Sequence, residues 1–141
     1  MQNPYAKMAD IYKTQQVQTA NREQILIMLY EGAIRFVKLA KEAQVQGDIE
    51  KSHTNILKSQ RIITEFMNTL KLDEGGEMAQ NLLSLYEYLH HRLIQANVKR
   101  QPAILDEVLQ HLRQLKNTWE KAITISNQEK AKKGKDNVYS A

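Results

Sequence analysis

The sequence predicts an all-α protein: an antiparallel up-down-up-down four-helix bundle, with an N-terminal arm or short helix and a flexible C-terminal tail. Apolar residues recur at steps of three and four along most of the chain, which is the period of a helix with one buried face. Strand-like alternation is missing. The few helix-breaking residues, Gly47, Gly75, Gly76 and Pro102, divide the middle of the chain into four segments.

The first two helices have well-defined predicted starts. The first is expected from about Asn21 to Gln46, because Asn21 can cap the helix and Gln24 completes a capping box. The second is expected from about Asp48 to Leu70, since Asp48 is a favourable N-cap directly after a glycine. Its apolar stripe consists of Ile49, Ile56, Ile63 and Leu70.

The third and fourth helices follow the glycine pair and the proline. The third is expected from about Gly76 to Lys99 and the fourth from about Pro102 to Ser126. Proline suits the first helical position, because its missing N–H costs nothing there. The stripe of the third helix is Met78, Leu82, Leu85, Leu89 and Ala96, and that of the fourth is Leu105, Val108, Leu112, Leu115, Trp119 and Ala122.

Short links between the helices force neighbours in sequence to run antiparallel. The chain therefore divides into an N-terminal arm at residues 1–20, a four-helix bundle at 21–126 and a disordered basic tail at 127–141. The arm is polar with scattered apolar residues, and the tail is rich in lysine with little apolar content.

The composition of the 141 residues argues against several classes of protein. Cysteine is absent, so disulfides and thiolate metal sites are excluded, and the cytoplasm is the expected compartment. The longest apolar run, residues 25–30, is too short to cross a bilayer, and residues 1–9 lack the apolar core of a signal peptide. The net charge of +4 is divided evenly between the two halves, so no basic patch for nucleic acid is expected.

Several helices carry more apolar residues than the roughly three positions in seven that one buried face needs. Residues 25–30 are apolar all the way round. The pattern leaves three interpretations open: a wide core with scattered surface apolar residues, a groove for amphipathic helices of a partner, and self-association. The surplus residues of the other helices are Ile62, Phe66, Leu83, Tyr86, Tyr88, Leu93, Ile104, Leu109, Ile123 and Ile125.

The sharpest enzymatic candidate is a di-metal carboxylate site, because two Glu-x-x-His motifs occur within the predicted bundle. The motifs are Glu50 to His53 and Glu87 to His90. Glu87 lies two residues from the stripe positions on either side of it, so it points to solvent. The second ligand set therefore fails, and no metal is expected.

Other motifs of catalysis or cofactor binding are missing. His90 and His91 are adjacent and diverge by about 100° on a helix, so they do not form a shared site. The glycine pair lacks the residues that follow in a phosphate-binding loop, and no serine lies in a nucleophile motif. The lysines of the tail are mixed with acidic residues and lack interleaved aromatic residues, which argues against nucleic-acid binding. We expect neither enzymatic activity nor a cofactor.

Four groups of residues form a pattern along nearly the whole chain. The arm has Asn3-Pro4-Tyr5, then Tyr12, Val17, Thr19 and Ala20. The first helix has Met28-Leu29-Tyr30-x-Gly32-Ala33, followed by Phe36. The third helix has Asn81-Leu82-x-x-Leu85-Tyr86-x-Tyr88 and Arg92-Leu93-x-x-Ala96-Asn97, and the fourth has Glu107-Val108 and Trp119. In order and spacing, this pattern resembles the flagellar secretion chaperone family, FliS.

Two departures from the family pattern lie near the N-terminus. Asn21-Arg22 stands where the family usually has Ser or Thr followed by proline, which keeps the helix cap and loses the proline. The spacing from Asn3-Pro4-Tyr5 to Tyr12 is longer than usual, and Tyr12 aligns better with the residues that follow it.

The resemblance implies a cytoplasmic, non-enzymatic chaperone that binds the disordered C-terminal segment of flagellin. It also implies prevention of premature polymerisation and delivery to the flagellar type III export apparatus. We expect the segment to wrap the bundle on its surplus apolar residues, with the arm around Tyr12 competing for one groove. The residues expected in the groove or arm are Tyr12, Val17, Ile56, Ile63, Met67, Tyr86, Leu93, Leu112 and Leu115; those expected in the core are Leu82, Leu85, Leu89 and Trp119.

Overall fold

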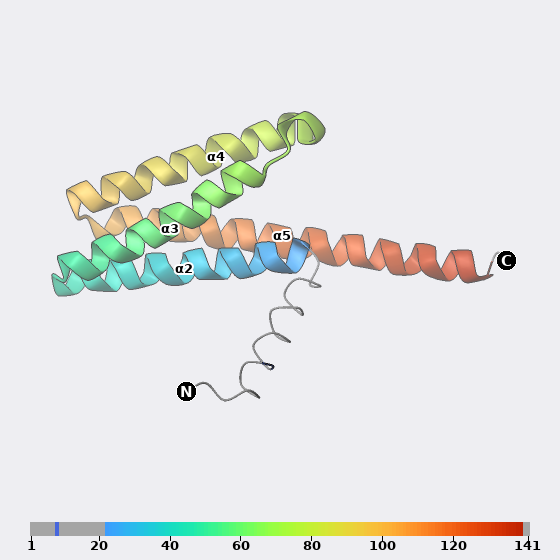
Figure 1. The fold of residues 1–141 in the computed structure, drawn as a ribbon, viewed down its shortest axis with the longest axis horizontal. Helices are drawn as coiled ribbons and strands as arrows, with labels where there is room; N and C mark the ends of the chain where they lie inside the picture. The colour runs from blue at the N-terminus through green and yellow to red at the C-terminus, as the bar shows by residue number, and fades with distance from the viewer. Residues whose placement is uncertain (1–7, 9–21, 140–141) are drawn as a thin grey trace.

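The computed structural model describes residue 8 and residues 22–139, with side chains described up to residue 134. Four helices make up the bundle: α2 (Arg22–Gln46), α3 (Ile49–Thr69), α4 (Leu72–Lys99) and α5 (Pro102–Tyr139). The described residues contain no strand, and successive helices run antiparallel (Figure 1). The predicted all-α bundle is confirmed.

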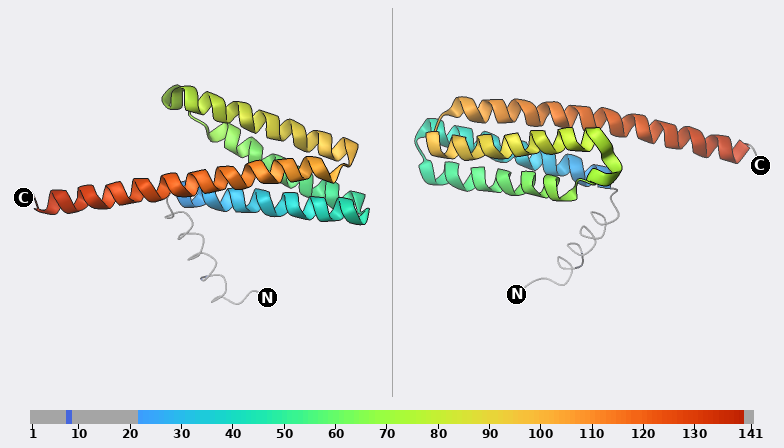
Figure 2. Two further views of the ribbon diagram at one scale, coloured as in Figure 1. Left: turned by 180° about the vertical axis from the view of Figure 1, so that it is seen from behind. Right: turned by 90° about the horizontal axis from the view of Figure 1, so that it is seen from above.

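The helices form a four-sided arrangement in which each packs against two neighbours. Helix α2 lies between α3 and α5, and α4 completes the bundle by packing against the same two helices (Figure 2). The contact between α4 and α5 is the least extensive of the four. The core consists mainly of aliphatic side chains, each of which stabilises the fold by about 1.5–3 kcal/mol when fully buried. Its largest aliphatic members are Val37, Ile56, Ile63, Leu89, Leu93, Leu105, Val108 and Leu112.

Local sequence signals account for the helix ends around α3 and α5. The carboxylate of Asp48 accepts a hydrogen bond of 3.1 Å from the backbone N–H of Lys51, which confirms the predicted N-cap. At the end of α4, Arg100 adopts a left-handed conformation (φ 53°) and its N–H donates to the carbonyl of Ala96. Pro102 opens α5 as predicted.

Helix α4 begins earlier than the sequence predicted. It starts at Leu72 rather than Gly76, and the backbone at Gly76 (φ 57°, ψ −137°) interrupts it after one short turn. Glycine adopts this conformation without a steric penalty because it lacks a Cβ atom. The glycine pair therefore bends the start of the helix instead of marking its first residue.

The prediction of a disordered tail at residues 127–141 is wrong for residues 127–139, which continue α5 as a helix. This part of α5 extends beyond the bundle (Figure 1). Its lysine, glutamate, glutamine and alanine residues favour helix, and proline is absent from it. An ion pair of 3.8 Å between Lys130 and Glu23 links it to the start of α2.

Helix α4 stays beside α3 but diverges from α5 toward its N-terminal end (Figures 1 and 2). At the opposite end, small buried residues such as Ala43 and Ala96 allow close approach, and the Gln44 side chain donates to the Ala96 carbonyl at 3.0 Å. Nearer the diverging end, the large rings of Phe66 and Tyr86 stand between the helices. We attribute the divergence to this change from small to large side chains, because core packing fixes the distance between helices.

Candidate partner-binding groove

The apolar stripe of α4 is divided between the core and the surface. Leu89, Leu93 and Ala96 are fully buried, whereas Met78 is 71% exposed and Leu82 is only partly buried. These residues follow each other at steps of three and four on one helix face. The stripe therefore continues beyond the core, and its first two turns lack a complete helix partner.

Two adjoining hollows follow this exposed part of the stripe. One, of about 450 Å³, is lined by residues of α4 alone, and the other, of about 280 Å³, reaches across to Leu70 and Trp119. Met78 and Leu82 line both, so the two hollows flank one apolar surface. We call it the Met78 groove and define it by Leu70, Met78, Leu82, Leu85 and Trp119.

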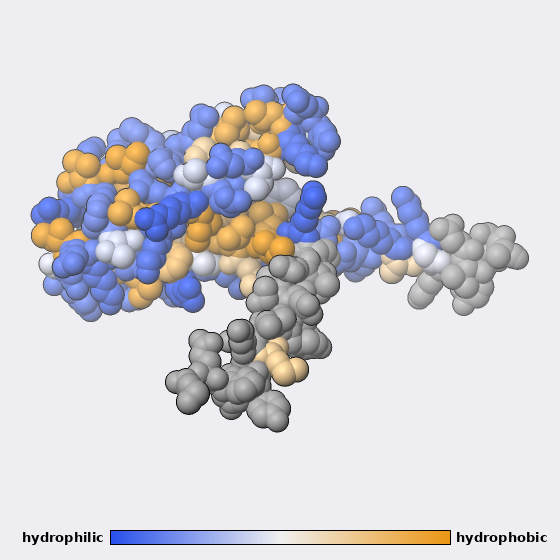
Figure 3. Space-filling model, in the orientation of Figure 1, coloured by the Kyte–Doolittle hydropathy of each residue, from blue (hydrophilic) through white to orange (hydrophobic). Residues whose placement is uncertain are grey.

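The surface around the groove is visibly apolar. Figure 3 shows hydrophobic residues on the N-terminal part of α4. Charged residues such as Lys71, Glu74 and Glu77 border the groove. An apolar floor with a charged rim is the surface that an amphipathic helix would fit.

An aromatic cluster in the core lies next to the groove. The Phe66 ring stacks on Tyr30 at 4.4 Å between centroids and lies 5.3 Å from Tyr86. The two phenol oxygens, which belong to α2 and α4, are 2.5 Å apart. Trp119, which lines the groove, packs against the same core. The cluster thus gives the groove a rigid inner wall.

Burial sets the ionisation of both phenols. It raises the pKa of Tyr30, and the neighbouring Tyr86 phenol raises it further. Burial also raises the pKa of Tyr86, although the hydrogen bond with Tyr30 opposes this shift. Both rings therefore stay neutral at ordinary pH.

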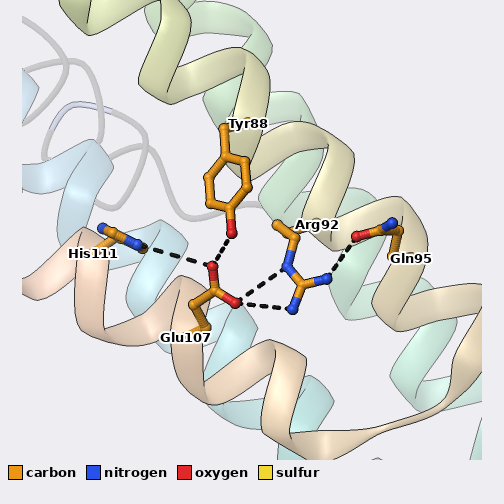
Figure 4. Close-up of polar contacts among 5 residues, drawn as sticks. All are labelled: Tyr88, Arg92, Gln95, Glu107 and His111. Carbon is orange, nitrogen blue, oxygen red and sulfur yellow. Dashed lines mark hydrogen bonds and ion pairs between the residues drawn. The ribbon is translucent and has the colours of Figure 1, made fainter.

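A polar cluster joins α4 to α5 just beyond the groove (Figure 4). Glu107 accepts hydrogen bonds from the Arg92 guanidinium at 2.8 and 3.2 Å and from the Tyr88 hydroxyl. Arg92 also donates to the side-chain oxygen of Gln95 at 2.7 Å, and His111 lies 4.0 Å from Glu107. The cluster holds the second half of α4 against α5, whereas the first half diverges.

The hydrogen bonds of this cluster shift two pKa values in opposite directions. The hydrogen bond from Tyr88 lowers the pKa of Glu107, with a smaller contribution from Arg92. The same bond raises the pKa of Tyr88, because only the protonated phenol can donate it. Glu107 is therefore ionised and Tyr88 neutral near pH 7.

The structure corrects the assignment of several residues to the groove. The five residues concerned are at most 2% exposed and lie in the core, so their side chains are not available to a partner in this conformation. The error arose because each helix has apolar residues on more than one side, and periodicity does not say which side faces inward. The five are Ile56, Ile63, Tyr86, Leu93 and Leu112.

The other expected site residues have different positions. Met67 and Leu115 are partly buried and pack against the core, and Tyr12 and Val17 lie outside the described residues. Of the residues expected in the core, Leu89 is fully buried, as predicted. Leu82, Leu85 and Trp119 are partly buried against the core and also line the groove.

The residues considered for metal binding are dispersed. Glu50, His53 and Glu87 are exposed, and the Nδ1 atom of His53 lies 2.7 Å from the side-chain amide nitrogen of Asn97. Among the described residues, no three metal-ligating side chains of His, Cys, Asp or Glu come together. No helix in the same part of the chain is long and apolar enough to cross a membrane.

Comparison with known proteins identifies the family. A family model described as "Flagellar protein FliS" matches residues 1–126. The chain belongs to the FliS family. Curated relatives named "Flagellar secretion chaperone FliS" include one from Bacillus subtilis, 33% identical over 87% of this chain and 88% of that protein. Another, from Vibrio cholerae, is 33% identical over 74% of this chain and 77% of its own length.

A solved structure supports the fold. The protein titled "Crystal structure of flagellar chaperone from bacteria" has a TM-score of 0.70, with 21% identity over 86% of this chain and 98% of that chain. The family is one of flagellar export chaperones rather than enzymes. The family match ends at residue 126, so the part of α5 that extends beyond the bundle lies outside it.

Proposed function

We propose that the chain is a cytoplasmic chaperone for flagellin and that the Met78 groove holds part of flagellin's disordered C-terminal segment. The observation that carries the proposal is the exposed continuation of the α4 stripe, in which Met78, Leu82 and Leu85 lie on one helix face beside Trp119. The names of the curated relatives support a role in flagellar export.

The groove favours a short helical portion of the partner. From Met78 to Leu85 the stripe covers about 10 Å, or about two helical turns. Protein interfaces usually bury about 800 Å² on each partner, which is more than two turns of helix supply. The flagellin segment therefore also contacts other parts of the bundle, and Met67, Leu115, Tyr12 and Val17 stay proposed contacts.

Binding at this groove would prevent premature polymerisation by a simple physical route. A segment that later packs as helices in a filament exposes apolar stripes while it is disordered. Covering these stripes removes the surface through which subunits associate, and the cost of ordering the segment keeps binding reversible. The chaperone can then release flagellin at the flagellar type III export apparatus.

A charge placed in the groove tests its role. Met78→Asp should abolish binding of flagellin, because an unpaired carboxylate would be buried against apolar partner side chains. Ile94→Asp is the matched control, since Ile94 is also an exposed apolar residue of α4 but does not line the groove. Circular dichroism should show native helicity for both variants. Equal binding by Met78→Asp and the wild type would exclude the groove as the site.

The identity of the partner requires a separate experiment. Co-purification with full-length flagellin should succeed, and co-purification with flagellin lacking its C-terminal segment should fail. Equal recovery of the two flagellins would contradict the proposed function. A sedimentation assay of filament formation should also show less polymer when an equimolar amount of the chaperone is present.

A further inference from the structure

A pocket outside the Met78 groove lies between α2 and α5, which run side by side (Figure 2). It has a volume of about 350 Å³ and shares no lining residue with the groove. Both helices form its walls, with Lys38 and Val45 on α2 and Leu109 and Arg113 on α5. We call it the Lys38 pocket.

Two ion pairs join α2 to α5 at this level of the bundle. Lys41 and Asp106 are 2.7 Å apart, and Glu31 and Lys116 are 3.5 Å apart. The two α2 residues are ten positions apart, as are the two α5 residues, so the ion pairs are separated by about 15 Å along both helices. Each pair matches a cation of one helix with a carboxylate of the other.

Between these two ion pairs, both helices carry unmatched cations. Lys38 and Arg113 are exposed and line the pocket, but neither forms an ion pair with any residue that the structure describes. Arg35 adds a third cation to the same interval of α2. Glu107 lies in the same interval of α5, but its carboxylate pairs with Arg92 of α4. The cations at the pocket therefore lack a carboxylate opposite them.

The charge and the apolar surface of the pocket define what would fit it. Like charges on facing helices repel each other, and a carboxylate between Lys38 and Arg113 would remove this repulsion and pair with both side chains. Leu109, which is 6% exposed, and Val45, which is 69% exposed, supply apolar surface beside the cations. A ligand that carries a carboxylate next to an aliphatic group would therefore fit the pocket.

The other charged residues of the pocket narrow the class of ligand. Glu42, Lys41 and Asp106 also line it, so three cations and two carboxylates give a formal charge of +1. The two carboxylates would repel a polyanion such as a nucleic acid, and none of the described lining residues is an aromatic on which a base could stack. A free phosphate ion would leave the apolar surface uncovered. A peptide with separate acidic and aliphatic side chains fits best.

We propose that the Lys38 pocket is a docking site for an acidic peptide segment of a second protein partner. One carboxylate of the segment lies between Lys38 and Arg113, and a neighbouring aliphatic side chain covers Leu109 and Val45. Because the pocket and the Met78 groove have no lining residue in common, one can be occupied while the other is filled. The proposal does not depend on what the Met78 groove binds.

A short acidic peptide tests the pocket directly. The probe is the capped peptide Glu-Leu-Glu-Glu-Leu-Glu-Glu, and the same peptide with glutamine in place of glutamate is its control. In NMR titrations of the full chain, the acidic probe should shift the Lys38 and Arg113 side-chain resonances in a saturable manner, and the glutamine peptide should not. Raising the salt concentration from about 50 mM to about 500 mM should weaken binding severalfold, because salt screens exposed charges. Absence of saturable shifts would overturn the proposal.

Reversal of the two charges should reverse the preference of the pocket. Lys38→Glu with Arg113→Glu should weaken binding of the acidic probe by about tenfold or more, and should allow binding of the same peptide with lysine in place of glutamate. Arg61→Glu with Lys99→Glu is the matched control, since both residues are exposed, lie outside the pocket and form no ion pair within the described part of the chain. The control should bind the acidic probe nearly as the wild type does. Equal weakening in the two double variants would reduce the effect to net charge and overturn the proposal.

Three competitors distinguish an acidic peptide from other occupants. Sodium phosphate that gives the same shifts at the same concentration as the probe would make the pocket a small-anion site. A single-stranded oligonucleotide that displaces the probe at an equimolar amount would make it a nucleic-acid site. Flagellin should bind the Lys38→Glu, Arg113→Glu variant as it binds the wild type, and a loss would assign the pocket to flagellin instead. Circular dichroism should show native helicity for both double variants.

Discussion

The hydroxyl of Tyr30 on α2 and that of Tyr86 on α4 form a hydrogen bond of 2.5 Å inside the core. Both residues are at most 2% exposed, and the Trp119 side chain also hydrogen-bonds to both phenols. The pair links the helix that carries the groove to the helix on the opposite side of the bundle. It also stands at the level where α4 begins to diverge.

Removal of one of these hydroxyls should destabilise the bundle. Tyr86→Phe removes one of the hydrogen bonds of the buried Tyr30 hydroxyl and leaves that with Trp119, so we expect the free energy of unfolding to fall by about 1 kcal/mol. The double variant Tyr30→Phe with Tyr86→Phe removes both groups and should recover part of this loss. Urea denaturation followed by circular dichroism measures both; equal stability of Tyr86→Phe and the wild type would contradict the prediction.

Alkaline pH should destabilise the protein through the same pair. Burial raises both pKa values in the folded state, whereas the unfolded chain loses these protons near the ordinary value of 10.0. The stability that the two protonated phenols contribute is therefore fully present below about pH 10. It falls as the pH rises from there toward their raised pKa values in the folded state. Urea midpoints at pH 9 and pH 11 should differ less in the double phenylalanine variant than in the wild type, and an unchanged difference would refute this link.

Acid should destabilise the contact between α4 and α5. The pKa of Glu107 is lowered in the folded state. The ionised carboxylate therefore contributes fully to the stability of the protein above the ordinary pKa of 4.5, and this contribution is lost as the pH falls through the lower pKa of the folded state. Glu107→Gln should weaken the contact with Arg92 by about 1 kcal/mol at pH 7. The difference in urea midpoint between the variant and the wild type should shrink as the pH is lowered from about 5 to about 3. A difference that stays constant over this range would contradict the role of Glu107.

Two leucines of the same α4 stripe should respond differently to truncation. Leu89→Ala creates a cavity in the core and should destabilise the bundle by about 2–5 kcal/mol. Leu82→Ala, on the partly buried section, should cost about 1 kcal/mol because less area is lost. Flagellin binding should weaken in Leu82→Ala, whereas Leu89→Ala should bind normally wherever it is folded. Equal losses of stability would contradict the division of the stripe.

Two glycines should give opposite results when changed to alanine. Gly76→Ala would place a Cβ atom at φ 57° and ψ −137°, which we expect to cost about 1–3 kcal/mol. Gly134→Ala lies within α5, where nothing is within 4 Å of the added atom, and should increase helix stability by about 0.5–1 kcal/mol. Thermal unfolding should resolve the first effect, and helix content by circular dichroism the second. A stable Gly76→Ala variant would mean that the start of α4 can relax to a regular helix.

Much of the fold was predictable from local sequence signals. Asp48 and Pro102 act on the backbone next to them, so their effect does not depend on the rest of the molecule. Gly76 was recognised as a helix breaker, but the sequence did not show that a turn of helix would form before it. The continuation of α5 was missed because polar composition and lysine content were taken as signs of disorder.

The groove was less predictable than the helices. Leu82 and Leu85 were assigned to the core, and Ile63 and Leu112 to the groove, although all four have similar side chains and similar spacing. Their burial depends on how far apart the helices are at each level. The distance is set by side chains of different helices, such as Tyr30, that are remote from them in sequence.

The sequence by itself determined the four helices, most of their limits, their antiparallel order and the family, because these follow from local capping, periodicity and ordered motifs. Only the tertiary structure decided that the stripe of α4 leaves the core between Leu89 and Leu85 and forms a groove. The physical reason is that one apolar stripe looks the same in the sequence along its whole length. Which part is buried depends on contacts with other helices, and here large aromatic rings separate those helices at one end.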